Sequence, residues 1–286
     1  MALTSIPLGI RSWVRNRGDE PAWVLTNLFF ETNPGNGSEH SALIERPALV
    51  NFLEAGDGPG RRLYRQPGFS NGDLFHVSGT ELYNHHMEVN RTVTSTQIVG
   101  LIDGDGTPDM AATYDYLFIT DGVTLQYTDG SSDLVAIDTP DDIPMVSLDV
   151  FDTYVMCVQN NSDRFYWINP GELTIDPLNF ATAERLPDAV LQVRAVGDEF
   201  WLLGEKSIEP WRATGDPDAP FQRIEGRRFD FGIFDGTAVR LPDSSVIAVS
   251  DQGTVYNIAG QPVPISDPSV AESVRDAIFA AIEAGA

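Results

Sequence analysis

The stretch from Ile102 to Asp109 contains the residues whose spacing comes closest to a metal-binding loop. Its carboxylates, Asp103, Asp105 and Asp109, stand at positions 1, 3 and 7 among glycines, a spacing with which a tight loop can turn several oxygens onto one hard cation. Tyr114 stands where a full calcium loop has its closing glutamate, and Asp-Gly pairs also form ordinary hairpin turns. The three aspartates are therefore a calcium hypothesis, and we assign no metal or other cofactor from the sequence.

Aspartates also recur where repeated units of the chain begin, at Asp73, Asp115, Asp152 and Asp198. A glycosidase needs two or three carboxylates that converge, with one placed to protonate the leaving oxygen. Turns and solvated strand ends explain these four aspartates more simply. We therefore expect no catalytic residues and no enzyme, and keep a carbohydrate-binding or carbohydrate-active protein as the alternative.

The remaining metal-binding and nucleophilic residue types give no site. His85 and His86 follow each other in a strand-like segment, and adjacent strand residues point to opposite faces, so the pair cannot chelate one ion. The single cysteine, Cys157, lies in the apolar run from Tyr154 to Val158 and is expected to be a buried thiol.

The elements that would position these residues come from a pattern that returns five times. Each copy has an apolar pair, a polar turn and a second aromatic or apolar pair, as expected for a β-hairpin. The intervals between corresponding apolar anchors are 43, 38, 45 and 46 residues, which is the range for one four-stranded propeller blade. The sequence therefore predicts an all-β protein, a β-propeller of five to six blades. The anchors are Phe75, Phe118, Met156, Trp201 and Ile247.

The domain organisation follows from where this pattern begins and ends. Residues 1–68, rich in proline and turn residues, are expected to form an N-terminal arm or an atypical first blade. Residues 69–265 are expected to form the propeller blades. Residues 266–286 are expected to contain a C-terminal helix, because Ser266 or Asp267 can cap it, Pro268 suits its first turn, and apolar residues recur every four positions from Val270 to Ile282.

The overall charge bears on possible partners. The 286 residues include 42 acidic and 18 basic side chains, a formal net charge of −24, so the surface repels nucleic-acid phosphates. No segment approaches the roughly 18 apolar residues of a membrane-spanning helix, and the start lacks the pattern of a secretion signal. We expect no specific DNA binding and no membrane association.

Several segments, taken in order, resemble a known family. The run Phe200–Trp211 is followed by Thr214–Asp216 and Pro220–Gly226. Further matching segments are Asn27–Glu31, Ala42–Pro47, Val77–Tyr83 and Val263–Ser266. Together they resemble the packaged-DNA stabilisation proteins of short-tailed bacteriophages, also described as tail hub or nozzle proteins. No single segment is chemically specific, but their order and spacing cover nearly the whole chain.

The resemblance implies a structural virion protein of the tail, made in the host cytoplasm. It implies a homo-oligomeric ring, a hexamer by analogy with the family, below the portal and adaptor ring. Such a ring would close or line the DNA exit channel, retain packaged DNA that passes without specific binding, and carry tail fibre, spike or needle proteins.

The chain departs from the family pattern in two places. Pro47-Ala48-Leu49 replaces Pro-Gly-Leu, and the sequence ends after the Val270–Ile282 helix, where members of the family continue into further strands. An exposed sheet edge would then need cover from the N-terminal arm, a partner chain or a neighbouring subunit.

Overall fold

The structure is a computed structural model that describes residues 28–33, 40–45, 53–104, 106–183, 188–217 and 219–283. The chain divides into two compact units, Met1–Glu54 and Ala55–Ala286. In the first unit, β1 (Leu28–Asn33) and β2 (His40–Glu45) pair as a two-stranded antiparallel sheet.

The second unit contains, among its described residues, five four-stranded antiparallel sheets, here called blades 1 to 5. Blade 1 consists of β3 (Gly60–Tyr64), β4 (Leu74–Ser78), β5 (Glu81–Met87) and β6 (Val93–Ile98). Blade 2 consists of β7 (Asp109–Ala112), β8 (Leu117–Thr120), β9 (Leu125–Thr128) and β10 (Val135–Ile137). Blade 3 consists of β11 (Met145–Phe151), β12 (Tyr154–Gln159), β13 (Arg164–Ile168) and β14 (Phe180–Thr182). Blade 4 consists of β15 (Val190–Val196), β16 (Glu199–Gly204), β17 (Ile208–Ala213) and β18 (Phe221–Arg223). Blade 5 consists of β19 (Val239–Arg240), β20 (Val246–Val249), β21 (Val255–Ile258) and β22 (Pro262–Pro264).

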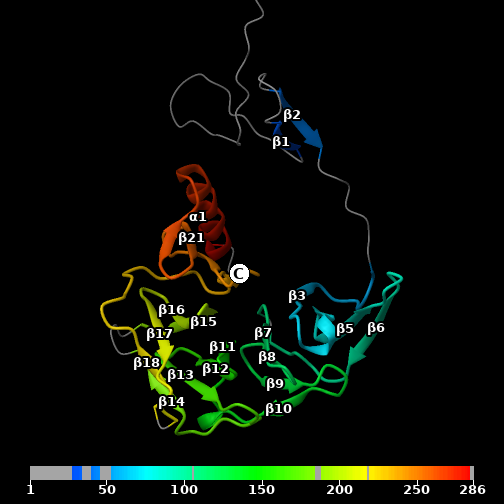
Figure 1. Cartoon of the computed structure of the whole chain (residues 1–286), viewed down its shortest axis with the longest axis vertical. Helices are drawn as coiled ribbons and strands as arrows, with labels where there is room; N and C mark the ends of the chain where they lie inside the picture. Colours follow the sequence, from blue (N-terminus) through cyan, green and yellow to red (C-terminus); the bar gives the residue numbers. More distant parts are fainter. Residues whose placement is uncertain are drawn as a thin grey trace, which may run out of the picture. The chain divides into compact units, whose positions relative to one another are not determined.

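Within this unit the first strand of a blade lies nearest a common centre and the fourth lies outermost, as β7 to β10 show in Figure 1. Consecutive four-stranded sheets disposed radially define a β-propeller. The predicted all-β propeller is confirmed, with five blades. The predicted anchors all lie on the second strand of a blade, which is β4, β8, β12, β16 or β20.

Tight turns set the register inside the blades. Asp152 and Thr153 connect β11 to β12 with φ values of 47° and 69°, the left-handed backbone of a two-residue hairpin turn. Gly197 takes the same region, with φ of 60°, between β15 and β16. Both are turn positions that the sequence marks with aspartate or glycine.

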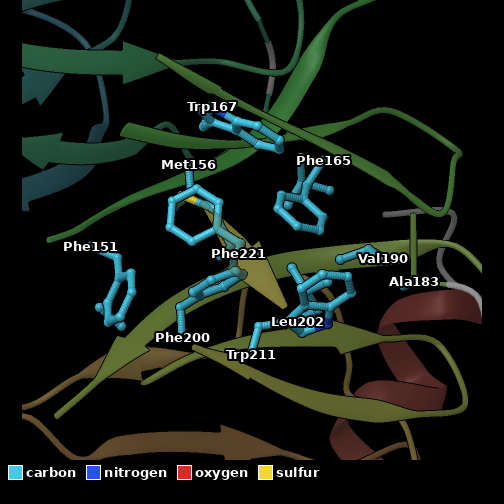
Figure 2. Packing of buried hydrophobic residues seen from close by; sticks show 13 residues of the cluster. Phe151, Met156, Phe165, Trp167, Ala183, Val190, Phe200, Leu202, Trp211 and Phe221 are labelled. Carbon is cyan, nitrogen blue, oxygen red and sulfur yellow. The ribbon is translucent and has the colours of Figure 1, made fainter. Parts of the chain in front are cut away.

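Four hydrophobic clusters fill the spaces between consecutive blades. Figure 2 shows the cluster between blades 3 and 4, where Phe165 and Trp167 of one sheet face Phe200 and Trp211 of the other. Each blade is too small to bury its faces alone, so these clusters hold the blades together.

The boundaries differ from the expected ones in one place. Blade 1 begins at Gly60 rather than at residue 69, because β3 pairs with β4. The sequence of β3, with adjacent Arg61 and Arg62, does not alternate between apolar and polar residues, so the repeat pattern does not mark it as a strand.

Short 3-10 helices lie at Ser70–Gly72 and Pro140–Asp142.

The C-terminal helix α1 spans Pro268–Glu283, as predicted. The Asp267 side chain accepts a hydrogen bond from the Val270 backbone N–H at 2.9 Å, which is the geometry of an N-cap. At the turn between β20 and β21, a Cβ on Gly253 would lie 2.9 Å from the Ala271 carbonyl oxygen, so the helix start packs tightly there. Of the helices in the described part of the chain, none has the length and apolar character needed to cross a membrane.

Candidate functional site

The first strands of all five blades contribute to one central cavity of about 610 Å³. Each brings a charged side chain to its wall, and we call this set the axial charge network. It comprises Arg62 of β3, Asp109 of β7, Asp149 of β11, Arg194 of β15 and Arg240 of β19.

The centre of the network is a buried ion pair between Arg194 and Asp109, with side chains 4% and 7% exposed. Arg194 Nη1 donates to Asp109 Oδ2 at 2.7 Å and Nη2 donates to Oδ1 at 3.0 Å, a two-point contact that fixes both groups. The Ser147 hydroxyl donates to the same Asp109 Oδ2 at 2.7 Å, and Arg194 Nε donates to the Ala238 carbonyl at 2.9 Å. This cluster ties blades 2, 3 and 4 to the segment that leads into blade 5.

Two partly exposed arginines extend the network to the terminal blades. Arg62 Nη2 lies 3.3 Å from Asp109 Oδ1, and Arg240 Nη1 lies 3.4 Å from Asp149 Oδ1. Asp149 also accepts the Ala195 backbone N–H at 2.8 Å. Every first strand is thus connected to another through a charged side chain.

The two buried acids respond to this environment in opposite ways. Burial alone would raise the pKa of Asp109, but the charge and hydrogen bonds of Arg194, aided by Arg62 and Ser147, hold it below the usual range. Burial raises the pKa of Asp149, and Arg194 and Arg240 offset that effect only in part. Asp109 is therefore fixed as a carboxylate that already has its partners, which suits a structural role better than proton transfer.

We expect acid to destabilise the propeller through Asp109. Its folded pKa is depressed, so its contribution is complete above the unfolded value of about 3.9 and is lost as pH falls through the folded pKa. Asp109→Asn should therefore flatten the fall in unfolding free energy below about pH 4, measured by urea denaturation across pH.

Asp149→Asn provides the matched control with opposite sign. The raised pKa of Asp149 makes its contribution decrease as pH rises above the unfolded value of about 3.9. Removing it should therefore steepen the rise of the unfolding free energy with pH just above about pH 4, whereas Asp109→Asn acts below that value. Equal slopes for both variants would contradict this assignment of the two acids.

Of the three aspartates of the calcium hypothesis, two lie in the described part of the chain, in different surroundings. Asp103 is exposed, Asp105 lies outside the described residues, and Asp109 is occupied by Arg194. The guanidinium of Arg61 donates to the carbonyls of Gly79 at 2.8 Å and Ile102 at 2.9 Å, and also to that of Gly104. Three backbone carbonyls in and beside this loop are thus hydrogen-bonded to an arginine. The described residues contain no group of three or more acidic, histidine or cysteine side chains able to hold a metal ion.

The histidines and the cysteine lie as their sequence positions predict. His85 is buried with its Nδ1 2.8 Å from the Ser95 hydroxyl, whereas His86 Nδ1 lies 2.6 Å from Asp73 Oδ1. Cys157 is buried, and burial raises the pKa of its thiol to about 12, so it stays protonated and unreactive.

The conspicuous residues of the matching segments serve packing and turns. Trp211 is 7% exposed in the cluster between blades 3 and 4. A Cβ on Gly204 would lie 2.7 Å from Asp188 Oδ2, and Gly226 has φ of 77° at a turn. Glu209 is 2% exposed, with Arg223 Nη1 4.0 Å from its Oε2.

The fold and its axial charge network define a five-bladed β-propeller held together at its axis by ion pairs. The family described as "Bacteriophage P22 Gp10, beta-propeller" matches residues 25–282, and the chain belongs to that family. This places it among bacteriophage structural proteins. Among curated proteins, no sequence matches the chain.

Solved structures show the same architecture at low sequence identity. A streptogramin B lyase superposes with a TM-score of 0.53 at 10% identity, over 76% of this chain and 71% of that one. Virginiamycin B lyase from Staphylococcus aureus superposes with a TM-score of 0.51 at 9% identity, over 73% and 70% of the two chains. At these identities the likeness extends to the fold alone.

Proposed function

We propose that this protein is a non-enzymatic tail nozzle or hub of a phage virion. Several copies, six by analogy, form a ring below the portal and adaptor that lines or closes the DNA exit channel and retains packaged DNA. The observation that carries this proposal is the family match over residues 25–282. Fibres, spikes or needle proteins would attach to the same ring.

The physical properties of the chain support such a role. Apolar clusters between blades and ion pairs between their first strands make a rigid unit, which a part under the pressure of packaged DNA requires. A net charge of −24 discourages DNA phosphates from adhering to the surface, so DNA can pass without being held.

The carbohydrate alternative finds less support at the axis. Sugar sites in propellers need exposed aromatic rings and carboxylates free to act on the substrate. Among the described residues that line the axial cavity, Tyr64 is the one aromatic, and Asp109 is held by Arg194.

The test is assembly. Cryo-electron microscopy and mass measurement of the purified protein, alone and mixed with a portal–adaptor complex, should give rings of about six copies that bind the complex. A stable monomer that does not join the complex would overturn the nozzle assignment. Hydrolysis or binding across a glycan panel would instead favour the carbohydrate alternative.

A further inference from the structure

The axial cavity has more positive charge than its ion pairs neutralise. Among the described residues of its wall, four guanidinium groups stand against two carboxylates, which leaves an excess of two positive charges. This excess is local, because the whole chain has a formal net charge of −24. The arginines are Arg62, Arg65, Arg194 and Arg240, and the acids are Asp109 and Asp149.

Two of the arginines share one carboxylate. Arg194 makes its two-point contact with Asp109, and Arg62 Nη2 lies 3.3 Å from Oδ1 of the same side chain. One carboxylate carries one negative charge, so Asp109 balances one of these two arginines. Arg240 lies beside Asp149, with 3.4 Å between Nη1 and Oδ1, and its side chain is 44% exposed to solvent.

Arg65 brings a charge to the cavity without an acidic partner in the described part of the chain. It follows β3 and is exposed, and its Nε donates to the Gly72 carbonyl at 2.7 Å. That hydrogen bond holds the guanidinium in place and leaves both Nη groups able to donate to a ligand. Ser244 adds a hydroxyl to the same wall.

The other end of the axis has the opposite charge. A smaller cavity of about 270 Å³ is lined mainly by residues before or early in the first strands. Its described wall contains Asp109, Asp121 and Asp235, with Arg62 as the one arginine. An anion near the axis is therefore attracted to the larger cavity and repelled from the smaller one.

The donors of the larger cavity fit a phosphate group. A guanidinium binds phosphate oxygens through two parallel, charged hydrogen bonds, which are stronger than hydrogen bonds between neutral groups. The volume of about 610 Å³ lies within the range of small-molecule sites and accommodates an anion with two phosphate groups.

We propose that the axial cavity binds a small anion of the phosphate class, held by the exposed Arg65 and Arg240 and by the less exposed Arg62. The anion offsets the excess positive charge of the wall and connects the first strands of blades 1 and 5. The site goes beyond the nozzle role and does not depend on it.

Calorimetric titration of the full chain with inorganic pyrophosphate tests this site. The unmodified chain should show saturable binding, and Arg65→Gln and Arg240→Gln should each weaken the affinity about tenfold or more, because each removes a charged donor. Arg275→Gln is the matched control, since Arg275 is exposed on α1 and does not line the cavity. The control should leave the affinity unchanged, and all three variants should keep the circular dichroism spectrum of the unmodified chain.

Arg65→Lys separates a defined contact from general charge attraction. Lysine keeps the positive charge but lacks the paired Nη donors, so the affinity for pyrophosphate should still fall severalfold. An affinity equal to that of the unmodified chain would contradict the paired contact of Arg65 with the anion.

Two trinucleotides, one with a 5′-phosphate and one without, identify the source of the phosphate. Binding of the phosphorylated trinucleotide alone, weakened by Arg65→Gln, would assign the site to a terminal phosphate of nucleic acid. Binding of pyrophosphate without binding of either trinucleotide would assign it to a free phosphate compound.

Three results would overturn the proposal. One is the absence of saturable binding at millimolar pyrophosphate. The second is an affinity that neither Arg65→Gln nor Arg240→Gln changes, which would place the anion outside the axial cavity. The third is an equal loss with Arg275→Gln, which would mean that pyrophosphate is attracted to basic side chains in general.

Discussion

Replacing Arg194 with methionine is expected to lower the free energy of unfolding by about 3–5 kcal/mol, because it removes the nearer, buried counter-ion of the Asp109 carboxylate and leaves the partly exposed Arg62 alone to offset its charge. Methionine preserves much of the arginine volume, so the loss reports the missing charge and hydrogen bonds rather than a cavity. Urea denaturation followed by tryptophan fluorescence measures it, with the shift of the midpoint read at constant slope.

Two further variants separate the charge effect from a general intolerance of methionine. Arg212→Met changes an exposed arginine and should alter stability by no more than about 0.5 kcal/mol. Combining Arg194→Met with Asp109→Leu should recover a large part of the loss, because replacing both members of a buried pair by apolar groups removes the unpaired charge. A loss of under about 1 kcal/mol for Arg194→Met alone would contradict the central place of this pair in the axial charge network.

The blades could be predicted because their signals are local. An apolar pair, a turn residue and a second apolar pair lie within about fifteen residues, and that information does not depend on distant parts of the chain. The same holds for α1, whose start is marked by the capping residue Asp267 and by Pro268.

The axial charge network could not be predicted because its contacts are distant. Arg194 and Asp109 are 85 residues apart, and one sequence does not show which arginine pairs with which acid. Local spacing instead suggested a cation loop for Asp109. One sequence signal does point to a buried ion pair, because the charged Arg194 lies within the strand-like segment Leu191–Val196. Charged side chains are rarely buried without a partner, so an acidic partner for Arg194 is expected.

Burial at the repeat anchors shows a second limit of what the sequence alone can predict. Trp201 and Ile247 occupy the same position of the repeat, yet one is fully buried and the other only half-buried. The repeat reveals which face of a blade is apolar, but it does not show which sheet covers that face.

The second large effect is expected at the junction between blades 3 and 4, where Phe200→Ala should lower the free energy of unfolding by about 3–5 kcal/mol. Phe200 is fully buried, and its ring centroid lies 5.2 Å from that of Phe151 and 5.3 Å from that of Phe221. Figure 2 shows it between the two sheets. Truncation leaves a cavity that the flanking strands cannot fill, because both are held by their own hydrogen-bond ladders.

Phe279→Ala is the matched control, since Phe279 lies on α1 and is 55% exposed. Its loss should stay below about 1 kcal/mol in the same urea titration. If the two alanine variants were equally stable, the blade junction would not depend on its aromatic packing, and the axial ion pairs would have to hold blades 3 and 4 together. Such a result would also predict that Arg194→Met separates these blades, which would make its unfolding transition broader than that of the unmodified chain.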